Sequence, residues 1–189
     1  SNTSWDRARF ESCGQKWCDV SEGHYGVSVL NDCKYGHSVK DGCIGLTLIK
    51  SGIEPNPVTD QEVHHFTYAL FPHQEGWQAG GTVRQAFFLN QPALVTAGGT
   101  ADAGESLASV DVPNVVLETI KQAEDGDGVI LRMYECENAL TPVTLTWAKP
   151  FTSAEAENCI EQKTGEVEVS GNQIRFTIKP YEVKTIRIR

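Results

Sequence analysis

Apolar and polar residues alternate in short runs along most of the chain. Residues 25–30 read YGVSVL and residues 44–49 read IGLTLI, and both runs are rich in β-branched or aromatic residues. Alternation with a period of two directs successive side chains to opposite faces of a strand. The pattern therefore predicts an all-β chain of antiparallel strands.

The second half of the chain repeats this pattern at the spacing typical of a β-sandwich. Strands are expected at residues 107–111, 115–120, 129–136, 141–147, 153–159, 166–170, 173–178 and 185–189. The Asp-Gly at residues 127–128 and the Gly-Asn at residues 171–172 suit tight hairpin turns. We expect two modules: the last part of a large β-sandwich at residues 1–106 and a small C-terminal sandwich at residues 107–189.

One segment has the period of a helix. Residues 82–90 carry apolar residues three and four apart, with Thr82 as a good N-cap and Pro92 just past the end. They predict one short helix among the strands. The strand expected just before it, at residues 64–73, is predicted to stop at Pro72 because proline has no N–H to donate.

The two ends of the chain show other patterns. Residues 1–18 hold aromatic and charged residues without a clean period, and we interpret them as a connecting segment. In residues 179–189, basic residues alternate with Val183, Ile186 and Ile188. This alternation predicts the solvated face of a strand.

Composition and charge exclude two classes of protein. The formal net charge is -9, and no stripe of Lys and Arg is interleaved with aromatic residues, so a nucleic-acid partner is not expected. No apolar run approaches the roughly 20 residues of a spanning helix, so a membrane protein is not expected either.

The cysteine pattern favours a reducing compartment. The chain is too long and too poor in cysteine for a disulfide scaffold, and it has no CxxC pair that would indicate a zinc or redox site. We therefore expect free thiols at all six positions: Cys13, Cys18, Cys33, Cys43, Cys136 and Cys159. The chain begins Ser1-Asn2 without an apolar segment, so no secretion signal is expected.

Histidines and acidic residues give no pattern of a metal or acid/base site. His64 and His65 are consecutive on a predicted strand and would point to opposite faces, so no metal site is expected. Asp19, Glu22 and Asp32 flank the strand at residues 25–30. We interpret these acids as caps and solvated strand ends, with a catalytic carboxylate pair as the alternative.

Five segments together carry a family resemblance. They read VSEGHYGVSVLNDCKYG (20–36), HHFTYALFPH (64–73), VRQAFFLNQP (83–92), PNVVLETIKQAEDGDG (113–128) and GNQIRFTIKPYEVKTIRI (171–188). In this order they resemble C-terminal segments of glycoside hydrolase family 38 α-mannosidases. The LNDCKYG form is similar to the cytosolic-type and bacterial branch of that family, which implies a cytoplasmic protein.

The resemblance implies a place within a larger enzyme. Family members combine an N-terminal α/β barrel and a helical bundle with C-terminal β-sandwiches, and they hydrolyse terminal α-mannosyl linkages with retention. Two carboxyls about 5 Å apart provide the nucleophile and the acid/base, and a zinc ion positions the sugar. No stretch of this chain resembles those upstream motifs. We therefore expect no catalytic residue, no metal ligand and no cofactor here, with zinc, the catalytic domain and the mannose-containing oligosaccharide belonging to the whole enzyme.

One loop is a candidate for contact with the sugar. In relatives a turn from the large sandwich reaches the sugar pocket, and residues 31–36 are the best candidate by position. Asn31, Asp32, Lys34 and Tyr35 are the candidate substrate-binding residues, with Lys34 donating to sugar hydroxyls and Tyr35 stacking or bonding. The alternative is a polar hairpin loop whose Asn-Asp pair bonds its own backbone.

Two other functions remain open. The chain can be a non-catalytic carbohydrate-binding or interaction module, because β-sandwiches host lectins as well as scaffolds. It can also be an intact enzyme of another chemistry. If the first module is incomplete, an exposed edge or apolar patch is expected, and this would favour a homo-oligomer.

Overall fold

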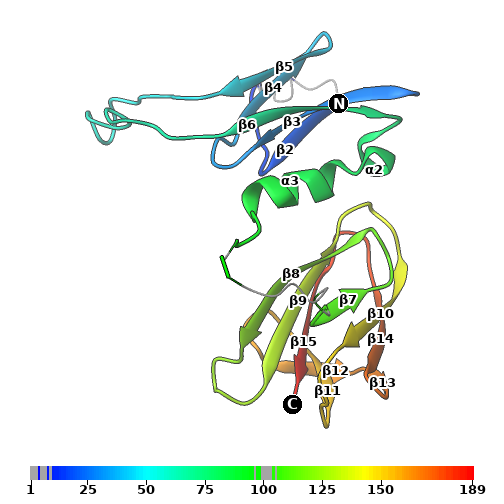
Figure 1. Cartoon of the computed structure of the whole chain (residues 1–189). Coiled ribbons are helices and arrows are strands. Elements are labelled where there is room, and N and C mark those ends of the chain that lie inside the picture. Colours follow the sequence, from blue (N-terminus) through cyan, green and yellow to red (C-terminus); the bar gives the residue numbers. More distant parts are fainter. Residues whose placement is uncertain (1–3, 5–7, 9, 96, 99–103, 105) are drawn as a thin grey trace. The chain divides into compact units, whose positions relative to one another are not determined.

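The computed structural model describes residues 4, 8, 10–95, 97–98, 104 and 106–189. The chain forms two compact units, Ser1–Ala97 and Gly98–Arg189. Both are built mainly from antiparallel strands, which confirms the predicted all-β class (Figure 1). The module boundary between residues 106 and 107 stays a prediction.

The Ser1–Ala97 unit contains two three-stranded antiparallel sheets. The first has the strand order β2-β3-β6 and consists of β2 (Trp17–Glu22), β3 (Tyr25–Asn31) and β6 (Tyr68–Gln74). The second has the order β1-β4-β5 and consists of β1 (Ser12–Cys13), β4 (Gly36–Lys40) and β5 (Cys43–Thr47). Strand β3 lies where residues 25–30 predict a strand.

Two predictions for this unit are wrong: residues 17–18 belong to a strand and not to a connecting segment, and the strand predicted at residues 64–73 begins at Tyr68 and continues through Pro72. Strand β2 begins at Trp17, inside the predicted connecting segment, because every residue from Trp17 to Glu22 pairs with β3. Strand β6 passes through Pro72 and ends at Gln74. Strand β6 is at the edge of its sheet, where a missing ladder N–H is tolerated, so Pro72 does not end the strand.

Two short helices follow β6, where one was predicted. Helix α3 (Thr82–Asn90) has the predicted limits, and α2 (Trp77–Gly80) precedes it. Gly81 ends α2 in the left-handed conformation, with φ of 74°, and is also the N-cap of α3. The predicted N-cap was therefore wrong by one residue, and Thr82 is the first helical residue. Neither described helix is long and apolar enough to cross a membrane.

The Gly98–Arg189 unit is a sandwich of a four-stranded and a five-stranded sheet. The first sheet has the order β13-β14-β10-β7, with β7 (Ala108–Val110), β10 (Thr141–Trp147), β13 (Glu168–Ser170) and β14 (Gln173–Ile178). The second has the order β12-β11-β15-β9-β8, with β8 (Val115–Gln122), β9 (Val129–Glu135), β11 (Ala154–Glu157), β12 (Lys163–Glu166) and β15 (Val183–Ile188).

The core of this unit lies between its two sheets. Strand β10 buries Val143, Leu145 and Trp147, the alternate residues that the sequence places on one face. They pack in one cluster with residues of the facing sheet, among them Leu131 and Ile186. Burial of each large aliphatic side chain stabilises the fold by about 1.5–3 kcal/mol, so this cluster is the main source of stability of the unit.

The hairpin predicted at residues 171–172 is confirmed. Ser170 of β13 pairs with Gln173 of β14, which leaves two residues in the turn. Gly171 has a φ of 60°, a backbone conformation that glycine adopts without steric cost.

The predicted solvated face of the last strand is wrong at Arg187. Strand β15 lies in the middle of the five-stranded sheet, with β11 on one side and β9 on the other. Arg187 is buried there, with Nε 2.6 Å from Glu157 Oε1 and Nη1 2.7 Å from Asp125 Oδ2. The basic residue is accommodated inside because carboxylates from two other segments compensate its charge.

Candidate functional site

The candidate loop joins β3 to β4, and Asn31 anchors its start. Asn31 is fully buried at the end of β3, and its carbonyl oxygen accepts a hydrogen bond from Asn90 Nδ2 of α3 at 3.0 Å. Its side-chain Oδ1 accepts from Lys34 N at 2.9 Å, and its Nδ2 lies 3.3 Å from His37 Nε2. The side chain of Asn31 therefore fixes the shape of the loop from inside.

Asp32 ties the loop to the segment that precedes β6. Asp32 Oδ1 accepts a hydrogen bond from Thr67 N at 3.0 Å, and Asp32 N donates to Thr67 O at 3.2 Å. The hydrogen bond from the Thr67 backbone holds the pKa of Asp32 below its ordinary value of 3.8. The side chain thus stays ionised at neutral pH and keeps the two segments together.

Lys34 is half-buried, and Cys33 and Tyr35 on either side of it are exposed. Lys34 Nζ lies 3.4 Å from His64 Nδ1 and 5.2 Å from the centre of the Phe66 ring, a cation–π contact. Phe66 in turn stacks on Tyr68, with the ring centres 6.4 Å apart. Tyr35 is exposed.

These side chains place a cation beside aromatic faces. We call Lys34, His64, Phe66 and Tyr68 the lysine–aromatic cluster. An ammonium group donates hydrogen bonds to hydroxyl oxygens, and aromatic faces pack against apolar surfaces, so the cluster has the chemistry that a sugar requires. His64, Phe66 and Tyr68 were not among the candidates predicted from the sequence. Their presence in the HHFTYALFPH segment, which carries part of the family resemblance, was the available signal.

A buried polar network lies on the face of the β2-β3-β6 sheet that contacts α3. Asp19 Oδ1 accepts hydrogen bonds from His73 Nε2 at 2.7 Å and from Ser28 Oγ at 2.6 Å, and its Oδ2 accepts one from Ser21 Oγ. Ser28 Oγ also lies 2.7 Å from Thr82 Oγ1 at the start of α3. Asp19 is thus a buried strand residue, so its interpretation as a solvated cap was wrong.

This network holds the sheet to the helices and has no catalytic geometry. Asp19 lies between Ser28 and His73, so the imidazole does not contact the hydroxyl that it would have to activate as a base. Burial opposes the charged form of each partner, but the hydrogen bonds outweigh it. The pKa of His73 is therefore raised above 6.5, and the pKa of Asp19 is lowered below 3.8 by bonds from Ser21, Ser28 and His73.

The remaining sequence candidates do not come together as a metal or sugar site. Among the described residues, no three His, Cys, Asp or Glu side chains are placed to hold a metal ion. Trp77, which the sequence alone leaves open as a rim or core residue or a sugar-stacking residue, packs against Trp17 with the ring centres 5.0 Å apart, so this contact occupies part of its surface. All six cysteines lie in described parts of the chain and are unpaired.

Comparison with known proteins identifies the family. Residues 1–58 match the glycosyl hydrolases family 38 C-terminal domain, and residues 114–186 match the family 38 C-terminal beta sandwich domain. Alpha-mannosidase 2C1 of Mus musculus is 37% identical over 98% of this chain and 19% of its own length. Alpha-mannosidase G of Dictyostelium discoideum is 35% identical over 98% of this chain and 18% of its own length.

Solved structures show the same fold. The crystal structure of an alpha-mannosidase from Enterococcus faecalis matches 95% of this chain and 21% of its own chain, with a TM-score of 0.72 and 20% identity. The chain spans about a fifth of the length of the curated relatives it matches. With two of the family's C-terminal domains in order along it, the chain belongs to glycoside hydrolase family 38.

Proposed function

We propose that this chain is the C-terminal β-sandwich part of a retaining α-mannosidase that hydrolyses terminal α-mannosyl linkages. The observation that carries the proposal is the similarity of 98% of the chain, at 35–37% identity, to proteins named alpha-mannosidases. Because those relatives are about five times longer, the role of this region is that of a scaffold for an upstream catalytic domain.

Catalysis belongs to that upstream domain in this proposal. The family resemblance assigns the two catalytic carboxylates and the zinc ligands to motifs that no stretch of this chain resembles. When bound, the zinc would polarise and position the sugar. The 189 residues by themselves are expected to hydrolyse no mannoside.

The loop after β3 supplies the contact with the sugar. Asn31 and Asp32 hold the loop through bonds to Lys34 N and Thr67 N, and this leaves Lys34 and Tyr35 to face the substrate. Lys34 Nζ has three hydrogens to donate, so its contact with His64 leaves donors for sugar hydroxyls. The substrate class is a mannose-containing oligosaccharide.

The test uses the full-length protein with an aryl α-mannoside. Lys34→Ala should lower kcat/KM by about 10- to 100-fold, the equivalent of a hydrogen bond from a charged donor. Lys40→Ala removes an exposed lysine at the end of β4 and should leave kcat/KM unchanged. Equal kcat and KM in Lys34→Ala and the wild type would show that the loop does not contact the substrate. A full-length protein without turnover would refute the proposed α-mannosidase activity.

The second candidate is a non-catalytic carbohydrate-binding module, favoured by the lysine–aromatic cluster. Its discriminating experiment is calorimetric titration of the 189-residue chain with methyl α-mannoside. Binding that is lost in Phe66→Ala would favour the module, whereas no heat at millimolar sugar is expected for a scaffold.

We place the protein in the cytoplasm. The support is the set of six unpaired cysteines, four of them exposed, which would be open to oxidation in a secretory compartment. Thiol titration of protein taken directly from cells under acid quench should find all six cysteines reduced, and oxidised pairs would argue for another compartment.

A further inference from the structure

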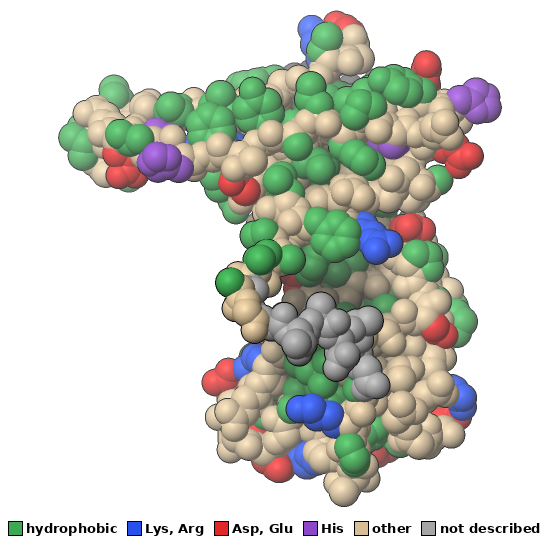
Figure 2. All heavy atoms as spheres, in the orientation of Figure 1, with side chains coloured by type: hydrophobic (Ala, Val, Ile, Leu, Met, Phe, Trp, Pro, Cys, Tyr) green, Lys and Arg blue, Asp and Glu red, His purple; other side chains and the backbone are tan. Residues whose placement is uncertain are grey.

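A long arm joins β5 to β6, and its base contacts the candidate loop. We call residues 48–67 the arm; they lie between the end of β5 at Thr47 and the start of β6 at Tyr68 (Figure 1). Figure 2 shows hydrophobic, acidic and histidine side chains along it. Asp32 of the loop forms two hydrogen bonds with the Thr67 backbone at the base of the arm. The loop and the base of the arm therefore form one junction.

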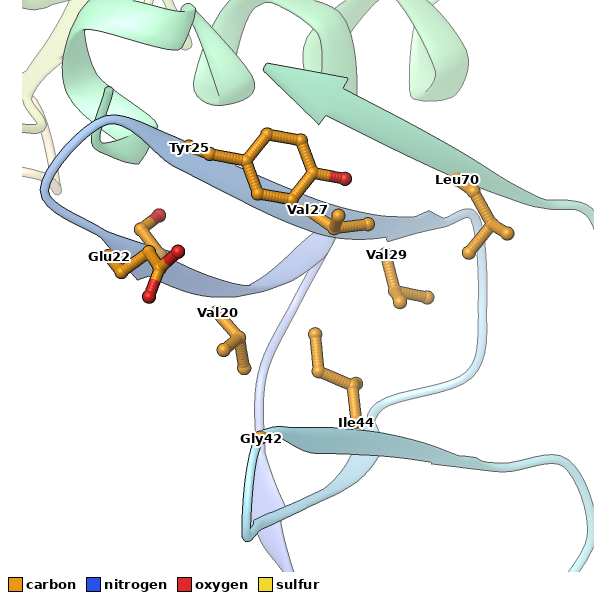
Figure 3. A pocket seen from close by; sticks show the side chains of 9 residues that line it. Val20, Glu22, Tyr25, Val27, Val29, Gly42, Ile44 and Leu70 are labelled. Atoms are coloured by element: carbon orange, nitrogen blue, oxygen red, sulfur yellow. The ribbon is translucent and has the colours of Figure 1, made fainter. Parts of the chain in front are cut away.

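The cavity of the same unit does not include this junction. A cavity of about 590 Å³ lies between its two sheets, and Val29 and Ile44 face each other across it (Figure 3). Most of its lining residues are aliphatic, and no member of the lysine–aromatic cluster lines it. Sites for small polar molecules need a few convergent polar groups. The junction is therefore the better place for a sugar contact.

His64 contacts both the rest of the arm and the candidate loop. Its Nε2 lies 3.0 Å from the carbonyl oxygen of Asp60, and its Nδ1 lies 3.4 Å from Lys34 Nζ. A carbonyl oxygen only accepts hydrogen bonds, so the hydrogen of the neutral ring is assigned to Nε2. Nδ1 then has a lone pair that accepts from the ammonium. The two contacts together select one tautomer and one orientation of the imidazole.

A neutral acceptor suits an ammonium group that has to bind a sugar. Lys34 gives one of its three hydrogens to His64, which leaves two for sugar hydroxyls. Among the described residues, no carboxylate forms an ion pair with Lys34, so its charge is not compensated. The four-carbon stem of lysine has many rotamers, and a contact that holds it before the sugar binds reduces the entropy lost on binding. His64 and the Phe66 ring both provide such a contact.

We propose that His64 is a positioning residue for the sugar contact of Lys34 and that it acts in its neutral form. The inference rests on the proposed function, because it takes Lys34 to bind the mannoside. Protonation would put a hydrogen on Nδ1, which lies 3.4 Å from Lys34 Nζ. Repulsion between like charges would then replace the hydrogen bond, and the ammonium would leave its place beside Phe66. Sugar binding should therefore weaken as the pH falls and His64 becomes protonated.

Lys34 is the charged side chain that contacts the imidazole among the described residues. Asp60 meets His64 through its carbonyl oxygen and not through its carboxylate. The other titratable side chains of the junction have contacts that do not involve the imidazole; they are Asp32, Cys33 and Tyr68. The expected pH effect is therefore assigned to the pair of His64 and Lys34.

The first test compares kcat/KM of full-length variants for an aryl α-mannoside. His64→Asn places an amide oxygen where Nδ1 lies and does not titrate, so it should keep the wild-type value at about pH 8. His64→Gln places its amide further from the backbone, where Nε2 lies, and should lower kcat/KM by about 3- to 10-fold. His65→Asn is the matched control, because the contact of this exposed neighbour with Cys33 is made by its backbone oxygen, and it should change nothing.

The pH profile distinguishes positioning from a structural role. Between about pH 8 and pH 5.5, kcat/KM of the wild type should fall at least about threefold relative to His64→Asn. The ratio of His65→Asn to the wild type should stay constant over the same range. A ratio of wild type to His64→Asn that does not depend on pH would overturn the proposal, as would full activity in His64→Gln with loss in His64→Asn.

The second test asks whether His64 acts through Lys34. In the Lys34→Ala background, His64→Gln should have no further effect on kcat/KM, because the group that it positions is absent. A full additional loss would mean that His64 acts independently of Lys34 and would overturn the positioning role. Nitrogen NMR of the 189-residue chain labelled at histidine should find the His64 hydrogen on Nε2 at about pH 8. A hydrogen on Nδ1 would overturn the proposal without reference to activity.

The inference and the proposed function fail in different ways. A full-length protein that hydrolyses the mannoside equally well with histidine, asparagine or glutamine at position 64 would refute the positioning role alone. A full-length protein without turnover would refute the proposed function and the inference that rests on it.

Discussion

Glu135 is a buried carboxylate that joins several segments at one end of the C-terminal sandwich. It lies at the end of β9 and is 1% exposed. Its Oε1 accepts hydrogen bonds from Asn114 Nδ2 at 3.0 Å and Glu137 N at 2.7 Å. Its Oε2 accepts from Asn138 N at 2.9 Å and Tyr181 N at 3.0 Å. One side chain therefore satisfies the donors of three separate segments.

Substitution of Glu135 by glutamine keeps the shape and removes half of the acceptors. Whichever way the amide is turned, its NH₂ group faces two N–H donors that the carboxylate oxygen had satisfied. A buried donor left without a partner costs about 1–3 kcal/mol, so Glu135→Gln should lower the free energy of unfolding by about 2–6 kcal/mol at pH 7. That is a large part of the stability of an ordinary domain, about 5–15 kcal/mol.

The effect should depend on pH in a defined direction. Burial disfavours the carboxylate, but the hydrogen bonds from Tyr181, Glu137 and Asn114 outweigh it, and the pKa of Glu135 lies below its ordinary value of 4.5. A lowered folded-state pKa contributes stability that is complete above the unfolded pKa and is lost as the pH falls through the folded pKa. Glutamine does not titrate, so the difference in free energy of unfolding between the wild type and Glu135→Gln should narrow below pH 4.5.

Urea unfolding followed by tryptophan fluorescence measures both effects, because Trp147 is buried in the same unit. Glu168→Gln is the matched control: it removes an exposed carboxylate whose partner is Arg175 at 3.3 Å, and should cost less than about 1 kcal/mol. A Glu135→Gln protein within about 1 kcal/mol of wild type at pH 7, or a difference that stays constant into acid, would refute the account of Glu135 as a multiple acceptor.

Three further substitutions test other parts of the fold. Asp19→Asn should lower the free energy of unfolding by about 1–3 kcal/mol. The pKa of Asp19 is lowered below 3.8 and that of His73 raised above 6.5, so the loss should be greatest between these values and shrink at pH 9, as urea unfolding at each pH would show. Gly128→Ala should lower the Tm in calorimetry, because φ is 101° and the added Cβ would clash with the backbone oxygen of Ile188; an unchanged Tm would contradict this. Leu145→Ala, at a fully buried position, should cost about 2–5 kcal/mol in urea unfolding, and a cost below 1 kcal/mol would mean a looser core.

Elements with local causes were predictable from the sequence. The Gly171-Asn172 hairpin follows from two residues that tolerate a tight turn, and α3 from apolar residues at helical spacing. Strand β2 was missed because its stability comes from pairing with β3. Arg187 was misplaced because the carboxylates that compensate it, Asp125 and Glu157, come from distant segments.

At the candidate site, too, the sequence indicated the local contacts and did not indicate the contacts between distant segments. The LNDCKYG segment indicated the loop, and the bond from Lys34 N to Asn31 Oδ1 is a local contact of the expected kind. The neighbours that give Lys34 its chemical setting, His64 and Phe66, lie about thirty residues further along the chain. No local pattern specifies that contact, because it depends on how the segment before β6 returns to β3.

The β2-β3-β6 sheet shows why alternation alone does not decide which face of a strand is buried. In β3, Ser28 and Val29 point to opposite sides, and both are buried. The serine is buried because Asp19 and Thr82 satisfy its hydroxyl under the helices. The valine lines a cavity that the described chain leaves partly unfilled. Each face of β3 is thus buried for its own reason: satisfied hydrogen bonds allow the serine to be buried, whereas the valine shares an aliphatic cavity with Ile44 of the second sheet, where the hydrophobic effect favours its burial.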